Sequence, residues 1–128
     1  MARSDARLDA VPHFDVTTLD GRRIRYQDIW QRRNLVLAVV SAADRDGAAR
    51  YASELQARER DFDREETTVV VTADAVTGLP APAVVVADRW GEIFHLEAAS
   101  GSTSNLSDVD ELLSWVHFVE IQCPECPP

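Results

Sequence analysis

The chain has 128 residues and a formal net charge of −9, which fits one acidic domain with its own core. All 13 basic residues are arginines and they are scattered, so the chain lacks both the basic surface that binds phosphates and any lysine amine. We therefore expect no nucleic-acid partner. No apolar run approaches the roughly 20 residues of a membrane helix, and no secretory signal opens the chain. We expect no membrane partner and a cytoplasmic location.

The chain divides into three predicted parts. Residues 1–10 are expected to form a solvated N-terminal arm, residues 11–121 one domain, and residues 122–128 a C-terminal tail. The domain begins with two short strands, Phe14 to Thr18 and Arg23 to Tyr26. They flank Leu19-Asp20-Gly21-Arg22, whose Asp-Gly pair is typical of a tight hairpin turn.

A parallel strand–helix–strand unit is predicted next. Leu35 to Val40 is a continuous apolar run, as expected for a strand buried on both faces. Apolar side chains then recur at helical spacing, and Thr67 to Thr72 is a second strand rich in β-branched residues. The helical stripe consists of Ala48, Tyr51, Ala52, Leu55 and Phe62.

The second half of the chain predicts two antiparallel strands and a last helix. Ala83 to Ala87 and Glu92 to Glu97 flank the turn Asp88-Arg89-Trp90-Gly91. Ser107 is the expected N-cap of the helix, with Asp110 three residues later, and the helix is expected to end near Glu120. Its apolar stripe consists of Val109, Leu112, Leu113 and Val116.

The connection between the second and third strands of this sheet is short. Only Ala73 to Pro82 are available, which is enough for one helical turn at most. We therefore expect one face of the sheet to be thinly covered, and a second copy of the chain in a homodimer is the expected cover.

Two stretches resemble the redoxin group of the thioredoxin-like superfamily, the peroxiredoxin-like proteins of the alkyl hydroperoxide reductase and thiol-specific antioxidant type. Residues 11–21, VPHFDVTTLDG, are similar to the family's opening "aPdF.l.tldG". Residues 82–93, PAVVVADRWGEI, are similar to its "PttfliDrdGrI". The strand Leu35 to Val40 matches the strand that leads into the active site. The resemblance spans Val11 to Val119 and implies an α/β, thioredoxin-like fold with an N-terminal β-hairpin and a central mixed sheet flanked by helices. The short connection from Ala73 to Pro82 departs from the family and predicts a shortened second crossover.

The resemblance also implies a redox pocket, in which Pro82 corresponds to the fold's cis-proline. The catalytic cysteine should follow the central strand, where helix amides lower a thiol pKa. That segment contains no sulfur, and Ser41 cannot cycle through sulfenic acid. Asp44 and Asp46 are interpreted as residues that start the next helix. The expected degenerate pocket consists of Ser41, Ala42, Asp44, Arg45, Ala48 and Pro82.

The two cysteines of the chain, Cys123 and Cys126, form a CPEC motif in the tail. Their spacing suits a reversible disulfide, and they are the candidate catalytic pair. It also suits two ligands of zinc or of an iron–sulfur cluster, completed by a second tail or by His117. A tail without chemistry is the third interpretation. Acidic Glu120 and Glu125 nearby would raise the thiol pKa values, so the pair would be a slow nucleophile.

Three functions follow from these observations. The first is thiol–disulfide redox activity through Cys123 and Cys126 on a protein thiol partner, which would make the chain an oxidoreductase without a cofactor. The second is a catalytically inactive thioredoxin-fold scaffold that binds proteins. The third is a homodimer that binds a metal through the same two cysteines.

Overall fold

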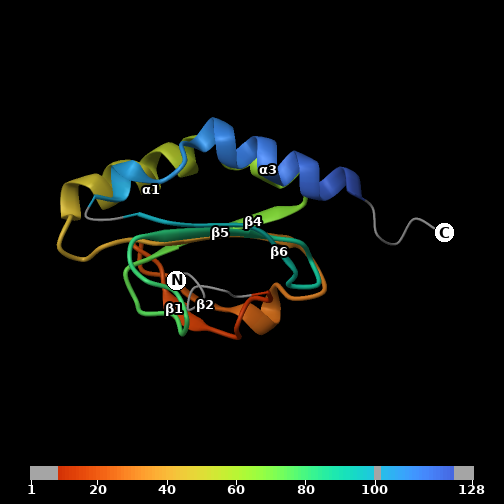
Figure 1. The fold of residues 1–128 in the computed structure, drawn as a ribbon, viewed down its shortest axis with the longest axis horizontal. Helices are drawn as coiled ribbons and strands as arrows, with labels where there is room; N and C mark the ends of the chain where they lie inside the picture. The colour runs from red at the N-terminus through yellow and green to blue at the C-terminus, as the bar shows by residue number, and fades with distance from the viewer. Residues whose placement is uncertain (1–8, 100–101, 123–128) are drawn as a thin grey trace, which may run out of the picture.

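The computed structural model describes residues 9–99 and 102–122. Helices lie on one side of a sheet, and the N-terminal hairpin and the loop after it lie on the other side (Figure 1). None of the helices in this part of the chain combines the length and the apolarity that crossing a membrane requires. In chain order the elements are β1 (Asp15–Thr17), β2 (Arg23–Arg25), the 3-10 turn η2 (Tyr26–Asp28), β3 (Asn34–Val39), α1 (Arg45–Ala57), α2 (Glu59–Arg64), β4 (Thr67–Thr72), β5 (Ala83–Ala87), β6 (Ile93–Ala98), η3 (Thr103–Asn105) and α3 (Val109–Gln122).

The main sheet has the strand order β4-β3-β5-β6. β3 and β4 are parallel, as the strand–helix–strand pattern predicts, and Asn34 lies opposite Thr67. β5 is antiparallel to β3, with Val39 opposite Ala83, and β6 is antiparallel to β5. β1 and β2 form a separate antiparallel hairpin, and Gly21 in its turn has a φ of 93°. The predicted mixed sheet with an N-terminal hairpin is confirmed.

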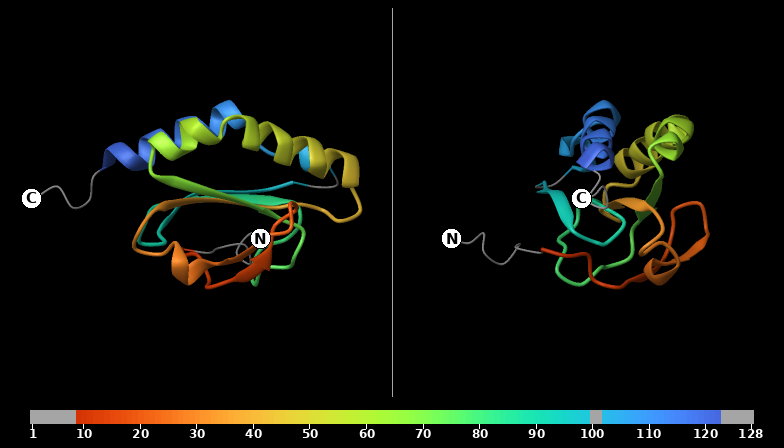
Figure 2. Two further views of the ribbon diagram at one scale, coloured as in Figure 1. Left: turned by 180° about the vertical axis from the view of Figure 1, so that it is seen from behind. Right: turned by 90° about the vertical axis from the view of Figure 1, so that its right-hand side faces the viewer.

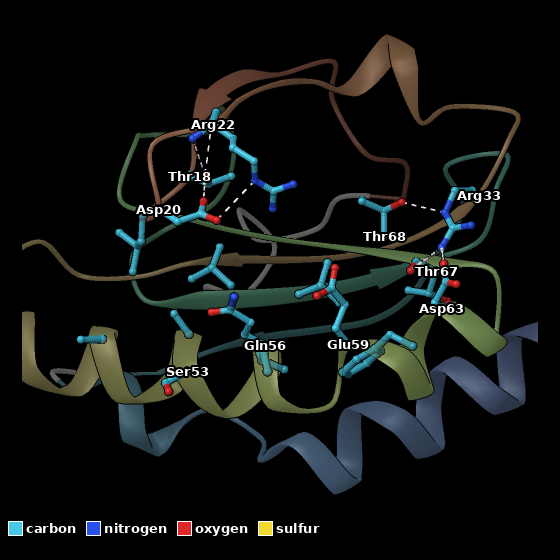
Figure 3. Close-up of a pocket in the computed structure, with 17 residues that line it drawn as sticks. Thr18, Asp20, Arg22, Arg33, Ser53, Gln56, Glu59, Asp63, Thr67 and Thr68 are labelled. Carbon is cyan, nitrogen blue, oxygen red and sulfur yellow. Dashed lines mark hydrogen bonds and ion pairs between the residues drawn. The ribbon is translucent and has the colours of Figure 1, made fainter.

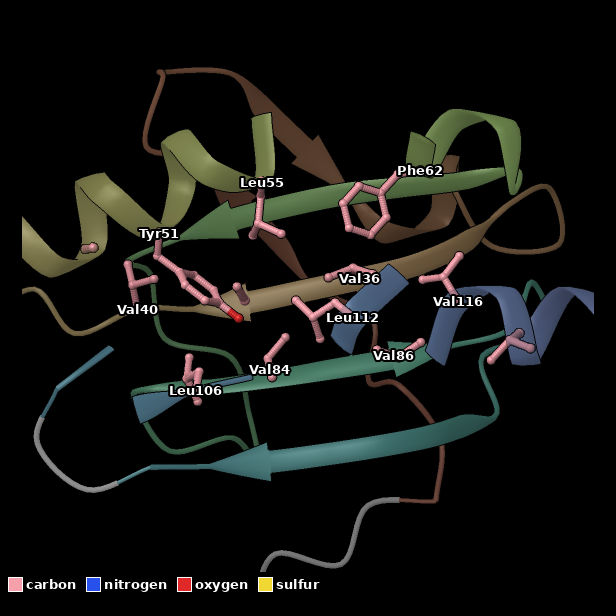
Figure 4. Close-up of a cluster of buried hydrophobic side chains, with 13 residues drawn as sticks. Val36, Val40, Tyr51, Leu55, Phe62, Val84, Val86, Leu106, Leu112 and Val116 are labelled. Atoms are coloured by element: carbon pink, nitrogen blue, oxygen red, sulfur yellow. The ribbon is translucent and has the colours of Figure 1, made fainter. Parts of the chain in front are cut away.

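β3 is buried along its whole length because both of its faces are covered. Val36 and Ala38 contribute to a core under the helices, together with Val40, which follows the strand. Figure 4 shows this core, in which Tyr51, Leu55, Phe62, Leu112 and Val116 converge from the three helices. Leu35, Leu37 and Val39 point to the opposite face and build a second core. The period of two along the strand thus divides one apolar run between two cores.

The expectation of a thinly covered sheet face is wrong. The connection between β4 and β5 contains no helix, as predicted, but residues 11–29 lie in the place that a helix would fill (Figure 2). Phe14, Val16, Tyr26 and Ile29 pack there against the second face of the sheet and are at most 8% exposed. The hairpin therefore closes the second core from within the chain, and this face gives no reason to expect a dimer.

The helices differ from the predictions in two details. The segment predicted as one helix breaks at Arg58, where the guanidinium bridges Asp61 and Asp110 at 2.7 and 2.8 Å. α3 begins after Asp108, whose carboxylate accepts a hydrogen bond from the Glu111 amide at 2.9 Å. Ser107 is not the N-cap, because its hydroxyl donates to Glu97 instead, at 2.6 Å. A half-buried carboxylate on β6 thus competes with the helix for this hydroxyl.

Two buried tyrosines provide a matched test of this packing. The Tyr51 hydroxyl donates to the Ser107 carbonyl at 2.7 Å and so links α1 to the start of α3. The Tyr26 hydroxyl is buried and has no hydrogen-bond partner among the described residues. Burial, and then the charge of Asp88, raise the pKa of Tyr26 to about 12, so its hydroxyl stays neutral near pH 7.

We expect Tyr51→Phe to lower the free energy of unfolding by about 1 kcal/mol, because it leaves a buried carbonyl without its donor. Tyr26→Phe should leave that free energy unchanged or raise it slightly, since it removes a buried hydroxyl that is not paired. Urea unfolding of both variants and the wild type at pH 7 measures the difference. An equal decrease in the free energy of unfolding in both variants would contradict this account of the two tyrosines.

Candidate functional site

The predicted pocket residues lie at one end of the sheet. The register of β3 and β5 places Val39 opposite Ala83. The segment that follows β3 and the residue that precedes β5 therefore lie at the same end of the sheet. The Ala81–Pro82 peptide bond is cis, which confirms that expectation. The Pro82 carbonyl accepts a hydrogen bond from the Ala99 amide at 3.0 Å. The topology thus brings Pro82 and the start of α1 to the same end of the molecule.

Some of the predicted residues line a hollow beyond the end of β3, here called the β3-end hollow. Ser41, Ala42, Arg45 and Ala48 contribute to its wall, together with Leu19 from the hairpin turn. The side chain of Ser41 is half-buried, and its oxygen accepts a hydrogen bond from the Ala43 amide at 3.3 Å. Asp44 and Pro82 are not among the residues that line this hollow.

Asp44 instead ties the start of α1 to the loop before α3. Its carboxylate accepts hydrogen bonds from the Gly47 amide at 3.2 Å, the Thr103 amide at 3.0 Å and the Ser102 hydroxyl at 3.2 Å. The Thr103 amide is the largest influence that lowers the Asp44 pKa; burial opposes it, while Gly47, Ser102 and the charge of Arg50 act with it. Asp44 is therefore an ionised N-cap, as its position predicts.

This cap decides what the helix terminus can do chemically. The amides at the start of α1 are the groups that would stabilise a thiolate, and the Asp44 carboxylate already accepts a hydrogen bond from one of them, the Gly47 amide. No sulfur lies in residues 41–48. None of the hydrogen bonds in the described part of the chain joins Ser41 to a histidine or a carboxylate that could activate its hydroxyl.

The histidines lie elsewhere. The His13 ring makes T-shaped contacts with Tyr26 and Trp30, with ring centroids 5.4 Å apart in both pairs. His95 stacks on Trp115 with ring centroids 4.7 Å apart. His117 lies 3.0 Å from a Glu65 carboxylate oxygen through its Nδ1 atom. Among residues 9–99 and 102–122, no group of three or more histidine, cysteine, aspartate or glutamate side chains is arranged to hold a metal ion. Cys123 and Cys126 lie outside the described residues, so their predicted roles stay predictions.

A second cavity, which the sequence analysis did not identify, lies along the edge of β4 (Figure 3). It has a volume of about 530 Å³ and is here called the β4 groove. The hairpin turn forms one wall, α1 and α2 form the other, and residues 67–71 form the floor. No sequence motif marks this groove, because three segments far apart in the chain build it. The half-buried Val69 and Val71 of an edge strand are its only local signal.

Similar architectures occur among solved structures. The peroxidoxin BcpB from Mycobacterium tuberculosis matches with a TM-score of 0.64 and 13% identity, over 87% of this chain and 96% of that one. A 2-Cys peroxiredoxin from Plasmodium vivax matches with a TM-score of 0.63 and 13% identity, over 91% and 81% of the two chains. This chain has a thioredoxin-like fold.

The thioredoxin-like fold is shared with a third kind of neighbour. A thiol:disulfide interchange protein of the thioredoxin family from Chlorobium tepidum has a TM-score of 0.55 and 12% identity, over 87% of this chain and 97% of that one. No family model matches the sequence, and no curated protein matches it either. These comparisons confirm the thioredoxin-like fold that the sequence predicts.

Replacing the Asp44 cap tests its place in this fold. We expect Asp44→Ala to lower Tm at pH 7 by roughly 3–6 °C, because the N-cap and the tie to the loop before α3 are lost together. Asp46→Ala is the matched control, since Asp46 lies in the same helical turn and is exposed. It should change Tm much less.

The effect of Asp44 should also depend on pH. Its pKa in the folded protein lies below the ordinary value of 3.8, so its stabilisation is complete above about pH 4 and is lost as pH falls through the folded pKa. The difference in Tm between the wild type and Asp44→Ala should therefore narrow below pH 4. Thermal unfolding followed by circular dichroism from pH 7 to pH 2.5 measures it, and a difference that grows in acid would contradict the cap.

Proposed function

We propose that this chain is a thioredoxin-fold protein-binding module that carries out no redox chemistry at the fold's usual site. The observation that supports this most strongly is Asp44, whose carboxylate places a negative charge at the helix terminus that would activate a thiol and accepts hydrogen bonds there from the Gly47 and Thr103 amides. The residues that line the β3-end hollow contain no sulfur, and no hydrogen bond among the described residues joins Ser41 to a base. What the fold offers instead is a well-packed scaffold with an open groove beside an edge strand.

The peroxide chemistry of the redoxin group provides the first test. Incubated with hydrogen peroxide and dithiothreitol, the full chain should consume peroxide no faster than buffer alone. A rate that depends on protein and persists in the double variant Cys123→Ser/Cys126→Ser would place peroxide chemistry within the domain and contradict the proposal. A partner retained on the immobilised chain should also be retained on this double variant.

A second candidate function is a dithiol in the tail that acts on a separate protein. It is favoured by where α3 ends. The Asn34 side chain donates to Glu120 at 2.8 Å, so the last turn of α3 lies beside the start of β3, and Figure 1 shows the helix leading away from the start of α1. Seven residues of extended chain separate Asn34 from Ser41, which is about 23 Å. The last described turn of α3 and the β3-end hollow therefore lie at opposite ends of β3.

This second candidate predicts that diamide removes two titratable thiols per chain and that a dithiol reductant restores them. The sulfurs would then exchange with a disulfide on another protein, with Cys123→Ser/Cys126→Ser as the inactive control. Elemental analysis of the purified protein separates this candidate from the metal-binding homodimer, which requires near-stoichiometric zinc or iron. Thiols that do not change under diamide would overturn the redox candidate.

A further inference from the structure

We propose that the β4 groove binds an extended segment of a partner polypeptide, which adds to the edge of β4 as a short strand and places a lysine or arginine beside Glu59. This inference rests on the proposed binding function and names its site and its class of partner. It is carried by three features of the groove: an open strand edge, walls that leave room for small side chains, and a carboxylate without a cationic partner.

The edge of β4 is open at its centre. The Glu66 and Thr72 carbonyls accept hydrogen bonds from the β3 side, from the Asn34 and Val40 amides, both at 2.8 Å. The backbone groups of the odd-numbered residues of β4 therefore face away from β3. The Val71 carbonyl is bound there by the Leu19 amide at 3.0 Å.

At the other end of β4, the Thr67 carbonyl is bound by the Arg33 guanidinium at 2.9 Å. Val69 lies between these two positions, and its outward amide and carbonyl have no hydrogen-bond partner among the described residues. A strand edge with unpaired donors and acceptors is a template for pairing with another chain. Leu19 and Arg33 limit the added strand to a few residues.

The walls of the groove fit the side chains of such a strand. Ala49 and Ala52 of α1 are small, and Leu19, which is 43% exposed, forms an apolar wall on the hairpin side. Val69 packs toward the helix-covered core, so the residue of an added strand opposite it would point toward α1. A groove volume of about 530 Å³ lies within the range of sites that hold small ligands or a few side chains.

The charges around the groove favour a basic partner. Arg22 pairs with Asp20 at 3.3 Å, and Arg33 pairs with Asp63 at 2.7 Å, so both cations of the rim are already matched. Glu59 points into the groove from the start of α2 (Figure 3) and takes part in no ion pair within the described part of the chain. The net charge of −9 acts in the same direction by attracting basic segments at long range.

A library of random seven-residue peptides displayed on phage, selected on the full chain, provides the probe. We expect enrichment of peptides that combine β-branched residues with an arginine or lysine. Synthetic copies should shift the Val69 amide resonance and slow its hydrogen exchange. The same peptides methylated at alternate backbone nitrogens, which removes donors from the added strand, should not bind.

Charge variants test the partner class. Glu59→Arg should weaken binding of the selected peptides by about tenfold or more, because it places like charges together. Glu54→Arg is the matched control, since Glu54 is exposed on the neighbouring helix α1 and does not line the groove; it should bind as the wild type does. Glu59→Gln removes the charge without placing a cation in the first turn of α2, so it should perturb that helix less than Glu59→Arg does. It should also reduce the preference for basic peptides. Circular dichroism confirms that each variant is folded.

Three outcomes overturn the groove inference: no peptide is enriched, the peptides leave the Val69 amide unchanged, or they bind Glu59→Arg as tightly as the wild type. If a partner protein is then retained equally by Glu59→Arg, the chain is still a binding module but uses another surface. If the chain consumes peroxide independently of its cysteines, the proposed function fails. The peptide measurements then still show whether the β4 groove binds an extended segment.

Discussion

The structure depends on the burial of β3 on both of its faces. Val36 and Ala38 pack under the three helices, whereas Leu35 and Leu37 pack against the hairpin layer, and each of these side chains is fully buried. One strand thus joins two cores, and the sheet cannot form without material on both sides of it. The N-terminal hairpin and α1 are held at opposite faces of the same strand, and this arrangement positions both the β3-end hollow and the β4 groove.

The short connection between β4 and β5 has consequences at the edge of the sheet. Without a helix in this connection, the segment from Val11 to Ile29 covers the second face and reaches the edge of β4 only at its turn, where Thr18 bridges Thr72. Along the rest of this edge, Arg33 binds the Thr67 carbonyl and the outward backbone groups of Val69 are open to solvent. The groove is therefore a by-product of how this chain closes its core. The start of α1 is a structural joint around Asp44, which ties this helix to the loop before α3.

Features encoded by local pattern were predictable from the sequence. The apolar run from Leu35 to Val40 indicates the central strand, and Asp44 is recognisable as a cap because it precedes a helical stripe. Features that depend on contacts between residues far apart in the sequence could not be predicted from it. Asp108 replaces Ser107 as the cap of α3 because Glu97 on β6 takes the serine hydroxyl. Likewise, no sequence motif marks the β4 groove, because its walls come from segments that meet only in the folded chain.

The edge of β4, which Leu19 and Arg33 cover in part, also bears on self-association of the chain. Residues 67–72, TTVVVT, are uncharged, β-branched and free of proline, which is the composition of segments that stack into cross-β fibrils. In the native state, Leu19 at one end and Arg33 at the other interrupt the ladder, so copies of β4 cannot align along their full length. The hairpin turn therefore limits pairing between copies of β4. If residues 18–22 detach, the Val71 carbonyl loses its donor and a longer stretch of unpaired backbone on β4 becomes accessible.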